Sequence, residues 1–463
     1  MGVIFRWSVV VVITTSSVLV ARSARADQPT VLKENGGWCW FQSQRAVGVD
    51  SKVFFTSIAG DNHGDWDGGD LVATAYDTKS GKIQNYKLHA KFNRDDHAVA
   101  GLTLIEDGRL LAVYGKHGND PLQRWRMTVK PGDITEWTDE QTFDVGASYT
   151  YSNVYQLPTE NNRIYNFHRG RGFNPNCSIS DDGGASWRYG WRLLQWTRED
   201  LKGDPRYTGL DGTRPYVCYA SNGHDAIHLV LSDDHPRAYD NSIYHGYYKA
   251  GKLHASDGRP LGSPASDRSS LTPRDFTEVF RGDADHVAWG CDIEVDNSGH
   301  PYVAFSVQVD GGEQRNQRAK GGLDHRYYYG RWDGNQWHVH PIARAGTKLY
   351  AGEDDYTGLV ALDPHDPNTV VISTNANPDT GEPLISSADA SRHWELFQGS
   401  TSNGGASWQW SALTSNSRED QLRPVIPDLP GEDRVILWTR GKLRSYRDYH
   451  LDIVALSQSR SLR

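Results

Sequence analysis

Short runs of alternating apolar and polar residues follow one another along most of the chain, and no long stretch shows the period of a helix. Turn-forming segments such as Glu106-Asp107-Gly108 and Asp296-Asn297-Ser298-Gly299 separate the runs. Alternation with a period of two is typical of strands that bury one face. The pattern predicts an all-β fold of many short strands, and clear examples are residues 53–58, 71–76, 226–231, 301–307 and 369–374.

The runs group into seven units of similar length, each with room for about four strands. No linker rich in Pro or Ser and no block of charge separates these units, which argues against independent domains. The 46 Gly, 16 Trp and 23 Tyr suit tight turns and aromatic layers between sheets. We therefore expect a single seven-bladed β-propeller over residues 27–463, with units at 37–92, 93–144, 147–196, 212–283, 285–345, 348–413 and 417–459.

Two segments resemble the Asp-box, a hairpin turn found on the outer rim of propellers. Residues 180–187 (SDDGGASW) fit the pattern S-x-D-x-G-x-S-W, and residues 401–408 (TSNGGASW) are a degenerate second copy. In such a turn Asp or Asn binds backbone amides, Gly adopts a positive φ, and Trp packs into the blade. We interpret both as markers of the fold, without a catalytic role.

The first 26 residues have the features of a secretory signal. Arg6 precedes an apolar stretch from Val9 to Val20, and Ala24-Arg25-Ala26 offers a cleavage site between small residues. No later stretch approaches the ~20 apolar residues of a membrane span. We expect a secreted or periplasmic protein that is not bound to a membrane. Removing the leader removes three arginines and no acid, which takes the net charge from −9 to −12 and argues against a nucleic-acid partner.

Little in the sequence indicates a metal or cofactor. The four cysteines show no CxxC spacing, so we expect no zinc or redox site and interpret them as buried apolar residues, with one disulfide as the alternative. The segment Asp61–Asp70 has oxygen ligands at alternating positions, as in a Ca²⁺ loop, but lacks the spaced Glu of an EF-hand. A structural calcium ion and a hydrated loop are both compatible with it.

Two histidines twenty residues apart are the main candidates for chemistry. His97 precedes the apolar run 102–105, His117 follows the run 110–113, and an Asp-Gly turn joins the two runs. A hairpin of this length brings its ends together, so both rings should meet at one mouth of the fold. That arrangement suits proton transfer, because the pKa of histidine is close to neutral pH. The alternative is two solvated loop residues.

The chain resembles the secreted BNR-repeat polysaccharide lyases, which include the ulvan lyases and the rhamnose–glucuronate lyases. The resemblance rests on short segments spread over nearly all of the mature chain. They are Asp96-His97-Ala98, Tyr114-Gly115-Lys116-His117, Tyr149-Thr150-Tyr151-Ser152-Asn153, Phe167-His168-Arg169-Gly170, Arg214-Pro215-Tyr216, His235-Pro236-Arg237, Asn241-Ser242-Ile243-Tyr244-His245, Asp355-Tyr356-Thr357-Gly358 and Leu422-Arg423-Pro424.

In that family two histidines about twenty residues apart act together with a Tyr and an Arg on the next blade. His97 and His117 match the pair, and Tyr155 and Arg171 have the family's separation of 16 residues. The resemblance thus implies that His117 or Tyr155 is the base, that the other returns the proton, and that His97 supports them. Arg171, or Arg169 on the same side of the strand, would hold the carboxylate of a uronic acid. Further candidates for substrate contacts are Arg214 and Arg237, for which a salt bridge and a turn role are the structural alternatives.

The expected activity is therefore β-elimination on an acidic polysaccharide, the expected partner of this protein. An arginine neutralises the uronate carboxylate, a neutral base removes the adjacent proton, and the reaction needs no metal-bound water and no cofactor. A sialidase-like hydrolase is one alternative, but the usual Arg-Ile-Pro start and the Tyr–Glu set of that class are not evident. A glycan-binding propeller without catalysis is the other. Neither the polysaccharide nor the oligomeric state can be deduced from the sequence.

Overall fold

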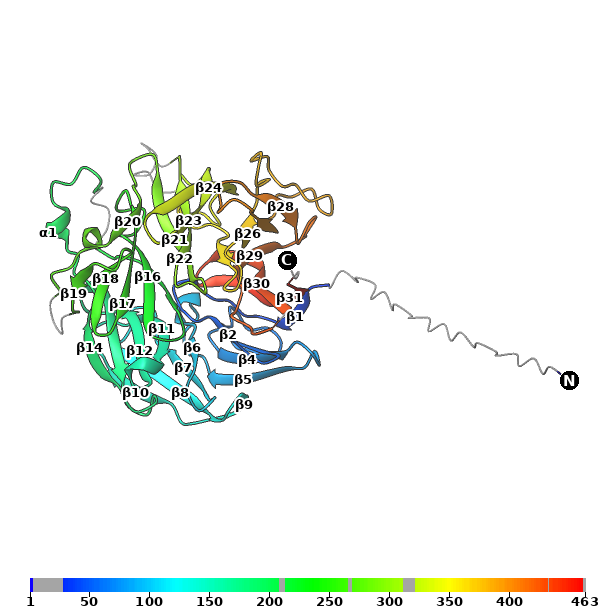
Figure 1. Ribbon diagram of the computed structural model, residues 1–463, viewed down its shortest axis with the longest axis horizontal. Coiled ribbons are helices and arrows are strands. Elements are labelled where there is room, and N and C mark those ends of the chain that lie inside the picture. The colour runs from blue at the N-terminus through cyan, green and yellow to red at the C-terminus, as the bar shows by residue number, and fades with distance from the viewer. Residues whose placement is uncertain (3–27, 208–212, 265–268, 311–320, 432, 461–463) are drawn as a thin grey trace.

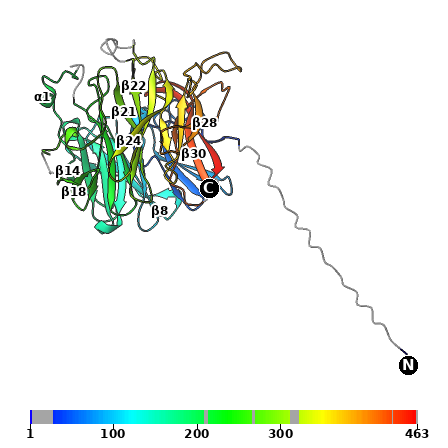
Figure 2. The same ribbon diagram turned by 45° about the horizontal axis from the view of Figure 1, so that its top comes forward.

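Seven antiparallel sheets form a closed ring of blades in the computed structural model of the chain (Figure 1). The structure describes residues 1–2, 28–207, 213–264, 269–310, 321–431 and 433–460. Apart from residues 1 and 2, the expected leader lies outside these ranges, and so does residue 27, the first residue of the expected propeller region. Figure 2, tilted by 45°, shows that the sheets stand side by side around a common axis. The seven-bladed β-propeller predicted from the sequence is confirmed.

The first four blades follow each other in chain order, starting near the centre. Blade one contains β2 (Ala46–Val49), β3 (Lys52–Ile58), β4 (Leu71–Asp77) and β5 (Ile83–His89), and blade two contains β6 (Gly101–Leu104), β7 (Leu110–Tyr114), β8 (Leu122–Lys130), β9 (Asp133–Trp137) and β10 (Gln141–Asp144). Blade three contains β11 (Thr150–Leu157), β12 (Arg163–Arg169), β13 (Pro175–Ser180) and β14 (Arg188–Arg192), and blade four contains β15 (Val217–Ser221), β16 (Ala226–Ser232), β17 (Ile243–Lys249), β18 (Lys252–Ala255), β19 (Pro260–Gly262) and β20 (Thr277–Phe280).

The last three blades complete the ring. Blade five contains β21 (Val287–Val295), β22 (Pro301–Gln308), β23 (His325–Trp332) and β24 (Trp337–Gly346), and blade six contains β25 (Val360–Leu362), β26 (Thr369–Thr374), β27 (Glu395–Ser400) and β28 (Gln409–Ala412). Blade seven contains β29 (Asp420–Val425), β30 (Asp433–Ser445), β31 (Asp448–Ser459) and the N-terminal strand β1 (Thr30–Lys33). Because β1 pairs with β31, the two ends of the chain close the ring in one sheet. Strand β1 lies before the first predicted unit and was not predicted from the sequence.

Helices are few and short in the described part of the chain. They are the α-helix α1 (Arg198–Leu201) and the 3₁₀ turns η1 (Asp96–Ala98), η2 (Pro158–Glu160), η3 (Arg171–Phe173) and η4 (Pro273–Asp275). No helix there has the length and apolar character needed to cross a membrane.

The two Asp-box-like segments form turns with matching hydrogen bonds. Asp182 accepts from the backbone N–H of Ser186 at 2.9 Å, and Asn403 accepts from that of Ser407 at 3.0 Å. The second Gly of each turn has a positive φ and donates its N–H to the first residue of the motif, at 2.9 and 3.1 Å. Both turns lie between the two outermost strands of their blades, β13 and β14 in one and β27 and β28 in the other.

A layer of aromatic rings crosses the axis of the propeller. This aromatic plug consists of Trp40, Phe41, Tyr151, Tyr216, Trp289 and Tyr356, all at most 9% exposed. The ring centroids of Trp40 and Trp289 are 5.2 Å apart, and those of Phe41 and Tyr216 are 4.7 Å apart. Such edge-on and tilted contacts stabilise each ring pair by about 0.5–1.5 kcal/mol beyond burial of the surface. The plug divides the central channel into two ends that share the same inner strands.

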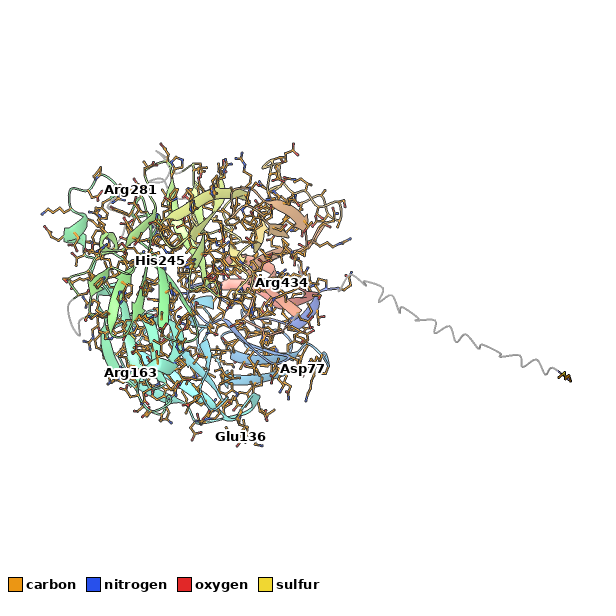
Figure 3. The ribbon with its side chains drawn as sticks, in the orientation of Figure 1. Asp77, Glu136, Arg163, His245, Arg281 and Arg434 are labelled. Carbon is orange, nitrogen blue, oxygen red and sulfur yellow. The ribbon has the colours of Figure 1, made fainter. Side chains whose placement is uncertain are left out.

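Figure 3 places several labelled side chains relative to the ring of blades. Asp77, Glu136, Arg163 and Arg281 lie towards its rim, whereas His245 lies further inside. His245 is fully buried in blade four, where its Nε2 lies 3.2 Å from Nδ1 of His228. Blades thus carry polar contacts of their own in addition to those at the axis. The four cysteines, by contrast, are all buried and unpaired, as the sequence analysis expected.

Candidate active site

The two candidate histidines lie together, one stacked on the other. The turn η1 carries His97, and His117 follows β7 at the far end of the hairpin formed by β6 and β7. Antiparallel pairing of Gly101 with Val113 brings these ends together. The ring centroids are 4.2 Å apart and the ring planes differ by 9°. The predicted meeting of the two histidines is therefore confirmed.

One buried carboxylate holds both rings. Oδ1 of Asp95 lies 2.8 Å from Nδ1 of His97, and Oδ2 lies 3.0 Å from Nδ1 of His117. Burial alone would raise the pKa of Asp95, but the charge of His97 and the hydrogen bond from His117 hold that pKa well below its usual range. An ionised carboxylate only accepts hydrogen bonds, so the Nδ1 atom of each ring carries a proton. Nε2 of His117 is then the nitrogen with an available lone pair.

The two histidines differ in charge. Burial alone would lower the pKa of His97, but the acidic groups around it, including the Asp96 and Asp95 carboxylates, raise that pKa well above its usual value. Burial and the charge of His97 lower the pKa of His117 to about 4, although the hydrogen bond to Asp95 opposes this. At neutral pH the pair thus consists of a protonated His97 and a neutral His117.

A second ion pair fixes the turn that carries His97. Nη1 of Arg423 donates to Oδ2 of Asp96 at 2.6 Å, and both side chains are completely buried. Nε2 of Gln42 donates to the carbonyl oxygen of His97 at 2.6 Å. The backbone of Arg423 has a φ of +54°, within an irregularity of β29. Buried charges are stable only when paired in this way, so Arg423 locks the position of η1.

The tyrosine beside the histidines is Tyr151, not Tyr155. Its ring centroid lies 5.8 Å from that of His97 and 6.3 Å from that of His117. Burial and the neighbouring Tyr216 raise the pKa of Tyr151 well above its usual value, so the phenol keeps its proton. Tyr155 lies four residues further along β11, where its hydroxyl donates to the carbonyl oxygen of Tyr219 at 2.7 Å. The structure thus separates Tyr155 from the pair that it was predicted to join.

The arginine that reaches this tyrosine is Arg169. Its guanidinium carbon lies 4.9 Å from the ring centroid of Tyr151, and Nη1 donates to the hydroxyl of Tyr216 at 3.3 Å. Arg171, the first choice from the sequence, lies in η3, where Nε donates to the carbonyl oxygen of Val145 at 3.2 Å. Its guanidinium stacks on Tyr189 at 3.8 Å. Because the strand ends at Arg169 and the chain turns, alternation does not extend to Arg171.

The remaining predicted arginines lie in blade four. Nη1 of Arg237 donates to Oε2 of Glu353 at 2.9 Å, and the backbone N–H of Arg214 donates to Oδ1 of Asp234 at 2.6 Å. Arg214 stands two residues before Tyr216, and Arg237 stands two residues after His235, whose ring centroid lies 5.6 Å from that of Tyr216. The ring centroid of Tyr216 is in turn 6.2 Å from that of Tyr151. Arg237 and Arg214 are therefore neighbours of the site through Tyr216, and their predicted contacts with substrate stay predictions.

A hairpin of blade seven adds two residues to the site that were not predicted from the sequence. Tyr446, between β30 and β31, presents its ring edge-on to His97 at 5.0 Å and to His117 at 5.8 Å. Nε of Arg447 donates to Oδ2 of Asp95 at 3.0 Å. These residues are more than 300 positions away from the histidines, so no local pattern could have found them. Tyr151, by contrast, stands in one of the segments that carried the family resemblance, and Asp95 directly precedes another.

Three groups among the described residues have a geometry that a metal ion could use. They are Cys39, Asp96 and His97; Asp95, His97 and His117; and His235, Glu353 and Asp355. In the second group the ring nitrogens and the carboxylate already bond one another. The segment Asp61–Asp70 is arranged differently, since Asp61 pairs with His450 at 3.0 Å and Asp70 pairs with Lys87 at 2.5 Å. A calcium ion in this loop stays a prediction.

Comparisons with known proteins agree with this architecture. Among curated protein sequences, none matches the chain. An ulvan lyase of polysaccharide lyase family PL25, solved with -[GlcA(1-4)Rha3S]- bound, has a TM-score of 0.65 at 16% identity, covering 93% of this chain and 98% of the other. The polysaccharide lyase Uly1 has a TM-score of 0.56 at 10% identity, covering 91% and 90%. The model of the BNR repeat-containing family matches residues 63–345, more than half of the chain, and the protein therefore belongs to that family.

Proposed function

We propose that this protein is a polysaccharide lyase that cleaves a uronic-acid-containing polysaccharide by β-elimination at the histidine end of the propeller. The observation that carries the proposal is the pair of stacked histidines on one carboxylate, in different protonation states, beside a protonated tyrosine and an arginine. A similar fold in two lyases supports the choice of reaction class. An enzyme that acts on a large acidic polymer would meet it outside the cytoplasm, which is the location that the N-terminal sequence predicts.

His117 has the properties of the general base. It is neutral at pH 7, since its pKa is about 4, and its Nε2 carries the available lone pair. Its side chain is 20% exposed, whereas that of His97 is only 4% exposed. A substrate can therefore reach His117. In the proposed reaction Nε2 removes the proton from C5 of the uronate, and the electrons of that bond form the double bond between C4 and C5.

Arg169 and His97 supply positive charge where negative charge develops. As the C5 proton leaves, charge grows on the adjacent carboxylate, and fixed cations stabilise it. Arg169 extends over Tyr151, and the protonated His97 is stacked directly on the base. Arg169 would bind the carboxylate through its planar fork, which keeps its charge at any working pH. The protonated His97 would add positive charge near the developing negative charge of the substrate without contacting the substrate.

Tyr151 completes the elimination as the general acid. The bond between C4 and its oxygen breaks, and the phenol gives its proton to that leaving oxygen. Its raised pKa means that the phenol is fully protonated before the reaction. Water then restores the proton to Tyr151 and takes the proton held by His117, so that the substrate gains only a double bond and a chain end.

The alternative of a sialidase-like hydrolase has less support at this site. That class uses carboxyl groups or a Tyr–Glu pair near the scissile bond. Here Asp95 holds the histidines and Asp96 is bound to Arg423. The carboxylate of Glu353 binds Arg237. All three carboxylates thus already have structural partners.

The products of a polymer digest test the proposal. The purified protein would be incubated with a panel of uronate polymers, sulfated and unsulfated, and the products followed by ultraviolet absorbance and mass spectrometry. A lyase yields an unsaturated uronate that absorbs ultraviolet light and is lighter by one water than the hydrolysis product. Reducing ends without ultraviolet absorbance would support a hydrolase instead. Binding without any cleavage of the bound polymer would support a glycan-binding propeller.

A further inference from the structure

A large cavity occupies the end of the central channel opposite to the histidines. Its volume is about 710 Å³, and the C-terminal parts of the inner strands line it. On β11, for example, Tyr151 belongs to the histidine end and Tyr155 lines the cavity. On β21, Trp289 belongs to the aromatic plug and Asp292 lines the cavity. The cavity is therefore separate from the candidate active site, with the plug between them.

Arg45 is a buried cation in the lining of this cavity. It lies next to β2, is 9% exposed, and forms no hydrogen bond or ion pair through its guanidinium within the described ranges. Its charge acts on the carboxyl groups of Asp292 and Glu294, so the guanidinium faces β21 across the axis. A buried charge without a partner is costly, and an anion that binds to it recovers much of that cost.

The ionised carboxylates of the lining are bound to other groups, although the charge of Asp292 acts on Arg45. The two oxygens of Asp292 accept from the backbone N–H groups of Ile293 and Leu362, at 3.1 and 3.0 Å. Asp428 pairs with His365 at 2.6 Å, and Asp296 pairs with Arg331 at 3.3 Å. Burial and the neighbouring Asp292 raise the pKa of Glu294 well above its usual value, which favours a neutral carboxyl group. A neutral carboxyl group can donate a hydrogen bond as well as accept one. The lining thus offers one cation without a direct partner, beside carboxylates that are already bound to other groups.

We propose that the cavity binds a carboxylate-bearing sugar of one or two rings, with Arg45 holding the carboxylate. The volume is within the range of about 300–1,000 Å³ that is usual for small-molecule sites. Hydroxyl groups of a sugar could bond to the polar lining, which includes Ser43, Gln44 and Asn222. Because this site shares no side chain with the histidine end, it does not depend on the proposed lyase activity.

Calorimetric titration of the full-length protein with D-glucuronate and D-glucose tests this proposal. The two sugars differ only in the carboxylate, so their comparison isolates the role of Arg45. The Arg169→Met variant is titrated first, because it removes the anion-binding side chain at the other end of the channel. We expect it to bind D-glucuronate at least about tenfold more tightly than D-glucose, as a desolvated charge pair would allow.

Variants of Arg45 in the Arg169→Met background then locate the binding site. Arg45→Met should reduce the affinity for D-glucuronate to that for D-glucose, and Arg45→Lys should keep part of the preference. Arg188→Met, which changes an exposed arginine at the start of the outer strand β14, should bind like its parent. Thermal melts check that each variant folds, because the charge of Arg45 also acts on Asp292 and Glu294. Arg45→Lys keeps that positive charge, so its loss of preference for D-glucuronate tests the guanidinium even if Arg45→Met does not fold.

Two results would overturn the proposal. One is that the Arg169→Met variant binds neither sugar, which would make the cavity a solvent-filled channel. The other is that Arg45→Met binds D-glucuronate as tightly as its parent. Neither result concerns the lyase proposal, because polymer cleavage is measured separately on the protein with Arg169 intact.

Discussion

The two ends of the central channel are built from the same inner strands but carry charge in different ways. At the histidine end each buried carboxylate has a cationic partner: Asp95 holds both histidines, and Asp96 binds Arg423. At the cavity end Arg45 is buried without a partner and Glu294 lies near it without a hydrogen bond in the described residues. Pairing at the first end fixes the direction of each ring. The unpaired groups at the second end leave capacity for a ligand.

This difference explains why we place the proposed chemistry at one end of the propeller only. A base must be neutral, oriented and reachable. His117 meets these conditions because Asp95 fixes its tautomer, and because burial and the charge of His97 lower its pKa. No comparable arrangement of two titratable rings on one carboxylate occurs among the described residues that line the cavity. Fixed charge pairs therefore favour catalysis at the histidine end, and the cavity suits binding.

The largest expected effect is a loss of activity when one of two tyrosines on β11 is changed, but not the other. Tyr151→Phe should lower kcat/KM by about 1000-fold, because it removes the proton donor for the leaving oxygen. Tyr155→Phe should leave kcat/KM unchanged and cost about 1 kcal/mol of stability, because only the hydrogen bond to Tyr219 is lost. Steady-state kinetics and thermal melts of both variants check this. Equal losses of activity would contradict the separation of the two ends.

The next effect concerns stability at the histidine end. Arg423→Met should destabilise the protein by about 3–5 kcal/mol, because it leaves Asp96 buried and unpaired. Arg188→Met is the matched control, and it should cost less than about 1 kcal/mol because its ion pair with Asp181 is exposed. Denaturant unfolding measures both. A loss for Arg423→Met no larger than for the control would show that η1 does not depend on this pair.

A smaller effect tests the shared carboxylate. Asp95→Asn should lower kcat by about 100-fold, since an amide can accept from only one of the two rings and so misorients the other. With the carboxylate gone, the pKa of His97 should fall, and the alkaline limb of the pH–rate profile should move to lower pH. Loss of activity without any movement of that limb would show a merely structural role for Asp95.

The smallest effect is the position of the acidic limb in the wild-type protein. The pKa of His117 in the folded protein is about 4, below the ordinary value of 6.5. His117 should therefore stay neutral, and kcat/KM should stay high, until the pH falls towards 4. In the same window the unfolded chain binds the proton more readily, so the free energy of unfolding should decrease as the pH falls from 6.5 towards 4. An acidic limb near 6.5 would contradict this assignment.

The sequence predicted the fold and the histidine pair well, because both depend on local patterns. Alternation and turns mark the strands of each blade, and the hairpin formed by β6 and β7 brings His97 and His117 together by its length alone. The closing strand β1 was missed because it is short and pairs with β31, more than 400 residues away.

The tyrosine and the arginine could not be identified by counting residues. The pairing of β11 with β12 shifts register between Thr150 and Asn153, and Tyr151 there has a φ of +62°. Such a bulge redirects a side chain and breaks the alternation that the sequence argument used. Arg171 fails for a related reason, because β12 ends at Arg169. Tyr446 and Arg447 arrive from blade seven, a contact that only the closed ring creates.

The most direct test of the central claim is the ultraviolet absorbance of a uronate polymer incubated with the wild-type protein and with His117→Ala. We expect the absorbance to rise steadily with the wild type and not to rise with the variant, while both proteins have the same melting temperature. A rise with both proteins would keep the lyase reaction but contradict His117 as its base. No rise with the wild type, on a polymer whose reducing ends still increase, would contradict β-elimination itself.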